Sequence, residues 1–200
     1  MYLLGSPSPY RRQLALSYCE LTNRPLSICT LSGDTTEGDL KQRREIVVKV
    51  REQRKQPEHT DNGEEASINP DNLFARRFAP RAPQNGKTGV SFSNQPPVTA
   101  ALSGGILVLD GIDRAERNVL PLLNNLLENR EINLESGELV VSAERYKELR
   151  DGYAERSNII PAHEDFRVIG LGLPVGPWKG EKLDPPLRSR FQCLRVDPPR

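Results

Sequence analysis

Short apolar runs that end at a polar residue or a glycine recur along this chain of 200 residues. The clearest is residues 106–110, in which four apolar residues lead into Asp110 and an amphipathic helix follows. Further candidate strands are Tyr2–Leu4, Phe166–Leu171, and Leu26–Leu31, in which apolar and polar residues alternate. Runs of this length predict strands that are buried on both faces, as in a parallel sheet.

Helical spacing of apolar residues fills the gaps between these strands. The predicted helices cover Arg11–Thr22, with Asn23 as its C-cap, Asp39–Val50, a segment from Asn118 as N-cap to Leu127, Ser142–Arg150, and one turn over Leu187–Phe191. Glu131–Leu134 and Glu138–Val141 flank a Ser-Gly pair, which is typical of a β-hairpin. The alternation of strands and helices predicts an α/β fold with a parallel sheet and right-handed crossovers.

Residues 51–97 differ from the rest of the chain in their prolines, asparagines and charges and in their few β-branched residues. Such a composition predicts a disordered, low-complexity insertion. The sequence thus divides into residues 1–50, the insertion 51–97, and residues 98–200. Because Met1 is followed at once by a core strand, we expect a truncated domain of a longer protein, without a targeting segment in this chain.

Composition excludes several classes of function. The net charge of +1 gives no overall attraction to nucleic acid or to anionic membranes. No apolar run reaches the roughly 18 residues of a membrane span. The three cysteines are widely spaced and form no CxxC pair, which argues against a zinc site or a disulfide framework and favours a reducing compartment.

The loop between the first predicted strand and helix, residues 5–12, lies where a phosphate-binding loop belongs. Gly5 fits that pattern, but Tyr10, Arg11 and Arg12 replace its Gly-Lys-Ser/Thr, so no hydroxyl is available for Mg²⁺. Arg11, Arg12 and the helix N-terminus could still hold phosphate. The alternative is an ordinary proline-rich turn. A second partial match, residues 85–89, lacks the first glycine and a preceding strand, so we read it as chance.

Asp110 and Arg190 are the candidate catalytic residues. A carboxylate at the end of a buried strand holds Mg²⁺ in P-loop NTPases, whereas Gly111 stands where hydrolysing enzymes carry a second acid. Arg190 lies near a short predicted helix and could act as an arginine finger on a neighbour's phosphate. The alternative for Arg190 is that it lies in a solvated basic turn. The alternative for Asp110 is that it has no catalytic role, because an isolated Asp after a strand is common in α/β proteins.

Taken in order, these segments resemble the AAA+ ATPases of the dynein-related, MoxR and midasin-like group. The residues that carry the resemblance are Leu31–Ile46, Ala115–Glu131, Ser142–Tyr146, Phe166–Ile169 and Leu183–Gln192.

The resemblance implies a P-loop core with strand order 5-1-4-3-2, followed in relatives by a helical lid that this chain lacks. It implies ATP and Mg²⁺ bound between neighbouring modules or subunits of a ring, and a mitochondrial location for the full protein. By position, Gly5 and Arg11 lie in the Walker A loop, Asp110 holds Mg²⁺ through water, Leu173 replaces a polar sensor residue, and Arg190 is the arginine finger.

The departures from the family pattern all affect the nucleotide site. Together they predict a domain that binds ATP weakly and does not hydrolyse it. Two hypotheses remain beside this one. In the first, the chain is a competent ATPase that uses Arg11 in place of the lysine and Asp113 in place of the missing acid. In the second, it is a structural module that serves only ring assembly.

Overall fold

The computed structural model describes residues 1–47, 89–152, 158–176, 178 and 180–197. Most of the predicted insertion, including residues 85–88 of the second partial phosphate-loop match, lies outside them. The described chain falls into two compact units, one formed by Met1–Arg43 with Asn94–Arg200 and the other by Arg44–Ser93. In chain order the elements are β1 (Tyr2–Leu4), α1 (Tyr10–Thr22), β2 (Leu26–Thr30), α2 (Glu37–Leu40), β3 (Gln42–Val47), β4 (Gly89–Asn94), α4 (Pro96–Ser103), β5 (Ile106–Asp110), η1 (Ile112–Arg114), α5 (Leu120–Glu128), β6 (Ile132–Asn133), β7 (Leu139–Val141), α6 (Ala143–Gly152), β8 (Ile159–Pro161), β9 (Arg167–Gly172), α7 (Pro185–Ser189) and β10 (Cys193–Arg195).

The larger unit is built on a five-stranded sheet with the order β10-β1-β9-β5-β2, in which every neighbouring pair is parallel. Numbered along the chain, these core strands stand in the order fifth, first, fourth, third, second. The prediction of a parallel sheet in this order is therefore confirmed. Parallel strands leave all their carboxyl ends at one edge of the sheet, where α/β proteins bind ligands.

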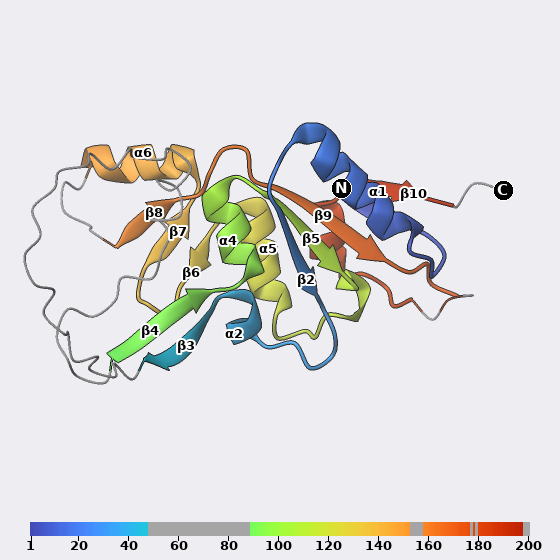
Figure 1. Ribbon diagram of the computed structural model, residues 1–200, viewed down its shortest axis with the longest axis horizontal. Coiled ribbons are helices and arrows are strands. Elements are labelled where there is room, and N and C mark those ends of the chain that lie inside the picture. The colour runs from blue at the N-terminus through green and yellow to red at the C-terminus, as the bar shows by residue number, and fades with distance from the viewer. Residues whose placement is uncertain (48–88, 153–157, 177, 179, 198–200) are drawn as a thin grey trace, which may run out of the picture. The chain divides into compact units, whose positions relative to one another are not determined.

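Helices cover both faces of this sheet (Figure 1). On one face α1 buries Ala15 and Cys19 against Ile106 and Val108. On the other face α4, α5 and α7 pack over Leu107 and Leu109. The residues of β5 alternate between these two cores and have no exposed surface up to Asp110. Burial on both faces explains why β5 is apolar at every position and not at every second one.

A three-stranded sheet, β6-β7-β8, extends the same unit. The antiparallel pair β6 and β7 confirms the predicted hairpin, and Gly137 in its turn has φ +86°, a conformation that favours glycine. β8, which pairs parallel to β7, was not predicted. The C-cap of α1 was predicted correctly, because Asn23 adopts the left-handed conformation (φ 49°). Helix α5 is capped by Val119 and not by the predicted Asn118.

One predicted helix is wrong. The segment expected to be helical over Asp39–Val50 consists of the short helix α2 followed by strand β3, which pairs with β4. The Gln42 side chain is buried at this junction, where it donates to the Asn94 side chain (2.7 Å) and accepts from the Ser136 amide (3.0 Å). These partners are distant in sequence, so tertiary pairing overrides the local helical preference.

The predicted end of the insertion is also too late. Residues 89–97 form β4 and the start of α4, with Pro96 and Pro97 at the first positions of the helix. Prolines there are compatible with a helix, because the first N–H groups have no partner inside it. The prolines that suggested disorder thus mark a helix start.

Leu109 and Leu21 offer a direct test of this core. Leu109 has no exposed surface, whereas Leu21 near the end of α1 is 87% exposed. We expect Leu109→Ala to lower the free energy of unfolding by about 2–5 kcal/mol, because it opens a cavity between β5 and its covering helices. Leu21→Ala is the matched control and should change it by less than about 0.5 kcal/mol. Urea denaturation followed by circular dichroism measures both, and equal losses would contradict the assignment of the core.

Candidate functional site

The candidate site is formed by the loop between β1 and α1, residues 5–9, and by the carboxyl ends of β5 and β9. Helix α1 begins at Tyr10, and Pro9 at its N-cap already has helical dihedral angles. The first turn of α1 contains no acidic residue. The unpaired N–H groups of a helix start give it a partial positive charge, so this turn favours an anion.

Gly5 is required by packing. A Cβ atom at this position would lie 2.0 Å from the carbonyl oxygen of Val196, in the segment that follows β10. The Val196 amide donates to the Leu4 carbonyl (2.7 Å), which holds the two segments together. The glycine that sequence analysis assigned to nucleotide binding is thus also needed for the close approach of two backbone segments.

Arg11 and Arg12 extend from the first turn of α1 to two different strands of the sheet. The Arg11 guanidinium donates to the carbonyl of Gly172, the last residue of β9, and its side chain is partly buried. Arg12 forms an ion pair with the carboxylate of Asp110, the last residue of β5. The structure therefore brings three predicted site residues, Arg11, Arg12 and Asp110, to one edge of the sheet.

This arrangement does not fit a Mg²⁺ ion of the kind that the fold family uses. Mg²⁺ prefers oxygen ligands in octahedral geometry. The loop position that supplies a hydroxyl in P-loop NTPases is Arg12, and the carboxylate of Asp110 is already occupied by its guanidinium. Among the described residues no group of three or more His, Cys, Asp or Glu side chains could hold a metal ion. Arg11 and Arg12 outnumber the single carboxylate of Asp110, so an anion suits the charge of this site better than a cation.

The backbone conformation at Gly111 explains why this position has no acidic side chain. Its φ is +82°, and a Cβ atom there would lie 2.8 Å from an Arg114 guanidinium nitrogen and 2.9 Å from the Leu31 carbonyl oxygen. The Gly111 amide donates to the Leu171 carbonyl (2.9 Å), and the Gly111 carbonyl accepts from the backbone amide of Arg114 (2.9 Å). An acidic side chain at this position would be strained in this backbone.

Asp113, the proposed substitute acid, lies in η1 and is only 5% exposed. Burial raises the pKa of its carboxyl above the ordinary value. It lines a cavity of about 790 Å³, together with Leu4, Leu173 and Arg188. Leu173 thus presents an apolar side chain at the end of β9, where the family pattern places a polar sensor residue.

Arg190 is held within the chain by α5 and α7. Its guanidinium forms an ion pair with Glu128 at the end of α5 and donates to the Pro186 carbonyl. Its side chain is 22% exposed, whereas that of Glu128 is 57% exposed. It shares no hydrogen bond or ion pair with Arg11, Arg12 or Asp110 among those that the structure describes. Nothing in the sequence pattern predicted Glu128 as its partner.

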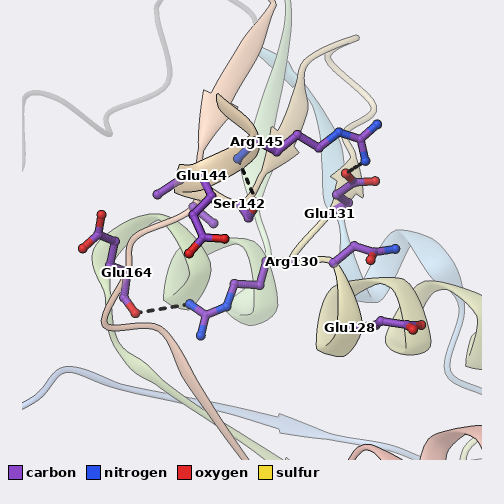
Figure 2. Close-up of a pocket in the computed structure, with 10 residues that line it drawn as sticks. Glu128, Arg130, Glu131, Ser142, Glu144, Arg145 and Glu164 are labelled. Carbon is purple, nitrogen blue, oxygen red and sulfur yellow. Dashed lines mark hydrogen bonds and ion pairs between the residues drawn. The ribbon is translucent and has the colours of Figure 1, made fainter. Parts of the chain in front are cut away.

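Glu128 also lines a polar hollow of about 440 Å³ (Figure 2). Within it Arg145 pairs with Glu131, and Arg130 donates to the Glu164 carbonyl at 3.3 Å. Glu164 lies just before β9, so this hollow is near the amino end of that strand, opposite the edge that contains Asp110. Its arginines are already engaged, and we assign it no part in nucleotide binding.

Comparisons with known proteins match nearly the whole of this chain. The family of AAA domains of the dynein-related subfamily matches residues 1–191. Von Willebrand factor A domain-containing protein 8 of Mus musculus is 43% identical over an alignment of 201 positions, which covers 98% of this chain and 8% of that protein. This chain thus spans a small fraction of the length of that curated relative.

A solved structure of a proposed ATPase from Cytophaga hutchinsonii aligns with the whole of this chain and with 41% of its own chain, at a TM-score of 0.54. The two sequences are 10% identical, so this likeness shows the fold alone. None of the helices in the described part of the chain has the length and apolar character that a bilayer crossing requires.

The raised pKa of Asp113 has a consequence for stability. The pKa of this carboxyl is higher in the folded chain than in the unfolded chain. Folding therefore becomes less favourable as the pH rises from the pKa of the unfolded state, about 4, through the pKa of the folded state. Asp113→Asn removes that charge at almost constant size. We therefore expect this variant to melt at a higher temperature than the unchanged chain at pH 7, with a difference that shrinks as the pH falls toward about 4.

Thermal unfolding followed by circular dichroism across this pH range measures the effect. Asp34→Asn, at an exposed position, is the control and should show no such pH-dependent difference. A lower melting temperature for Asp113→Asn at pH 7 would mean that the ionised carboxylate stabilises the fold, contrary to our interpretation.

Proposed function

Since this chain belongs to the dynein-related subfamily of AAA domains, we propose that it binds ATP within a ring-forming ATPase and has lost hydrolysis of its own. In sequence and fold it is an AAA-family ATPase domain. Members of this family in general use nucleotide and Mg²⁺ and assemble in rings. The mitochondrial location stays a prediction from the resemblance.

The observation that carries the proposal is the pair Arg11 and Arg12 in the first turn of α1, at the carboxyl edge of the sheet. Two cations at a helix start that lacks acidic residues attract a polyphosphate. Pro9 supplies no N–H, and the Tyr10 side chain occupies a position where relatives have glycine. These two differences weaken the phosphate cradle, so we expect low affinity.

Loss of hydrolysis follows from three positions. Gly111 offers no acid to orient a water, Leu173 offers no polar contact, and Asp110 is paired with Arg12. Removal of a single transition-state donor typically lowers kcat by about 10²–10³. Three such losses in one site are more than a domain of this kind is expected to tolerate while it still turns over ATP.

The competent-ATPase hypothesis would need Asp113 to act as the missing base. Burial raises the pKa of this carboxyl, which by its direction alone is compatible with a base. The cavity that Asp113 lines includes neither Arg12 nor Asp110 among its lining residues. This position weighs against that hypothesis. The purely structural hypothesis is an outcome of the binding experiment below.

Arg190 supports a second part of the proposal, a contribution to the site of a neighbouring module. In AAA rings an arginine from one subunit stabilises the charge that develops on its neighbour's phosphate. Here the guanidinium lies after α7 and its partner Glu128 is more than half exposed. Because the carboxylate partner of this ion pair is open to solvent, a phosphate could displace it from Arg190.

We expect the 200-residue chain to bind ATP and to release no phosphate from it above background. Replacing both Arg11 and Arg12 by Gln should weaken binding at least about tenfold, because two charge-assisted contacts are lost. Calorimetric titration and a phosphate-release assay measure the two properties, with Arg24→Gln as the control. Steady turnover would favour the competent enzyme, and no binding with intact assembly would favour a structural module.

Arg190→Ala tests the finger in an assembled ring of the protein that contains this domain. We expect ATPase activity to fall by about 10³-fold or more at the site it completes. Glu128→Gln is the matched control, because it breaks the same ion pair and keeps the arginine. If both variants lose the same activity, the ion pair acts through the fold and the finger role is wrong.

A further inference from the structure

The Arg12 guanidinium contacts Asp110, at the position where P-loop NTPases have the carboxylate that holds Mg²⁺. The two residues are 98 positions apart in sequence and meet only because α1 begins above the carboxyl end of β5. Asp110 pairs in register with Thr30 of β2 and Leu171 of β9, so it stands between two neighbouring strands at the carboxyl edge of the sheet. Arg12 contacts it from the helix.

A guanidinium and a divalent cation exclude each other at one carboxylate. The guanidinium stays protonated at any pH at which proteins are folded, so its positive charge cannot be withdrawn when an ion approaches. Mg²⁺ would have to displace Arg12 from Asp110, and residue 12 would supply no oxygen ligand in exchange. In relatives with a hydroxyl at this position the same carboxylate is free to hold the ion through water.

Arg12 still has donors to offer. One guanidinium nitrogen contacts Asp110, and the side chain is 52% exposed, whereas that of Asp110 is 19% exposed. A guanidinium has five N–H groups in a planar fork that matches phosphate oxygens. The remaining donors of Arg12 can therefore face an anion above the sheet edge, while the contact with Asp110 fixes their direction.

From these contacts we infer that the site takes a nucleoside triphosphate free of Mg²⁺, with Arg12 in the place of the metal ion. This inference rests on the proposed function, because it presumes that ATP binds at this edge. A triphosphate without Mg²⁺ has two more negative charges than its magnesium complex, which suits a site that already contains Arg11 and Arg12. Arg12 performs the bridging task of Mg²⁺ between the carboxylate and the phosphates.

The test is calorimetric titration of ATP into the 200-residue chain, in excess EDTA and in excess Mg²⁺. For the unchanged chain we expect the affinity in EDTA to equal or exceed that in Mg²⁺. Arg12→Thr restores a hydroxyl and frees Asp110, so Mg²⁺ should tighten ATP binding to this variant by about tenfold, the effect of one charge-assisted contact.

Arg24→Thr is the matched control, because Arg24 also forms an ion pair with an aspartate, Asp165 (3.1 Å), at the far end of α1. It should behave like the unchanged chain in both buffers. Melting temperatures establish that each variant is folded. Direct titration of Mn²⁺, followed by electron paramagnetic resonance, adds a readout without nucleotide: binding by Arg12→Thr and none by the unchanged chain supports the inference.

The outcomes separate this inference from the proposed function. If the unchanged chain binds ATP only in Mg²⁺, Arg12 does not replace the ion, although the domain still binds nucleotide. If it binds ATP in neither buffer while Arg12→Thr binds it in Mg²⁺, Arg12 blocks the site and the inference is wrong. If no variant binds ATP in either buffer, the nucleotide-binding proposal itself fails.

Discussion

Burial of β5 on both faces is the constraint on which the rest of this structure depends. Its residues from Ile106 to Leu109 have no exposed surface and alternate between a core under α1 and a core under α4, α5 and α7. Parallel pairing with β2 and β9 then fixes where the strand ends. Asp110 is the first residue past full burial, so the chain must present a carboxylate at the sheet edge on which α1 begins.

At that edge the substituted residues form one electrostatic arrangement. Relatives in this fold place a lysine, a hydroxyl and a magnesium ion around the strand-end carboxylate. Here the cations belong to the protein, since Arg12 contacts Asp110 and Arg11 contacts the end of β9. Gly111, with its left-handed backbone, leaves no place for a second acid. This arrangement is the basis of our proposal that the domain attracts phosphate and does not activate water.

Prediction from sequence failed where distant partners decide the conformation. Residues 42–47 have a composition that suits a helix, yet they form a strand because β4 lies beside them and because Gln42 is buried between Asn94 and Ser136. Pro96 and Pro97 suggested disorder, yet they occupy the one part of a helix that accepts proline. In both cases the local pattern was compatible with two structures, and only packing selected one.

The sequence by itself determined the class of fold, the order of the core strands through the family resemblance, the hairpin, and the candidate residues Gly5, Arg11, Arg12, Asp110 and Arg190. Periodicity and motif spacing are local properties, so they can be recognised in the sequence without knowledge of tertiary contacts. Only the tertiary structure decided what these side chains touch. Arg12 meets Asp110 across 98 positions and Arg190 meets Glu128 across 62, because side-chain pairing depends on how strands and helices pack, which no local pattern records.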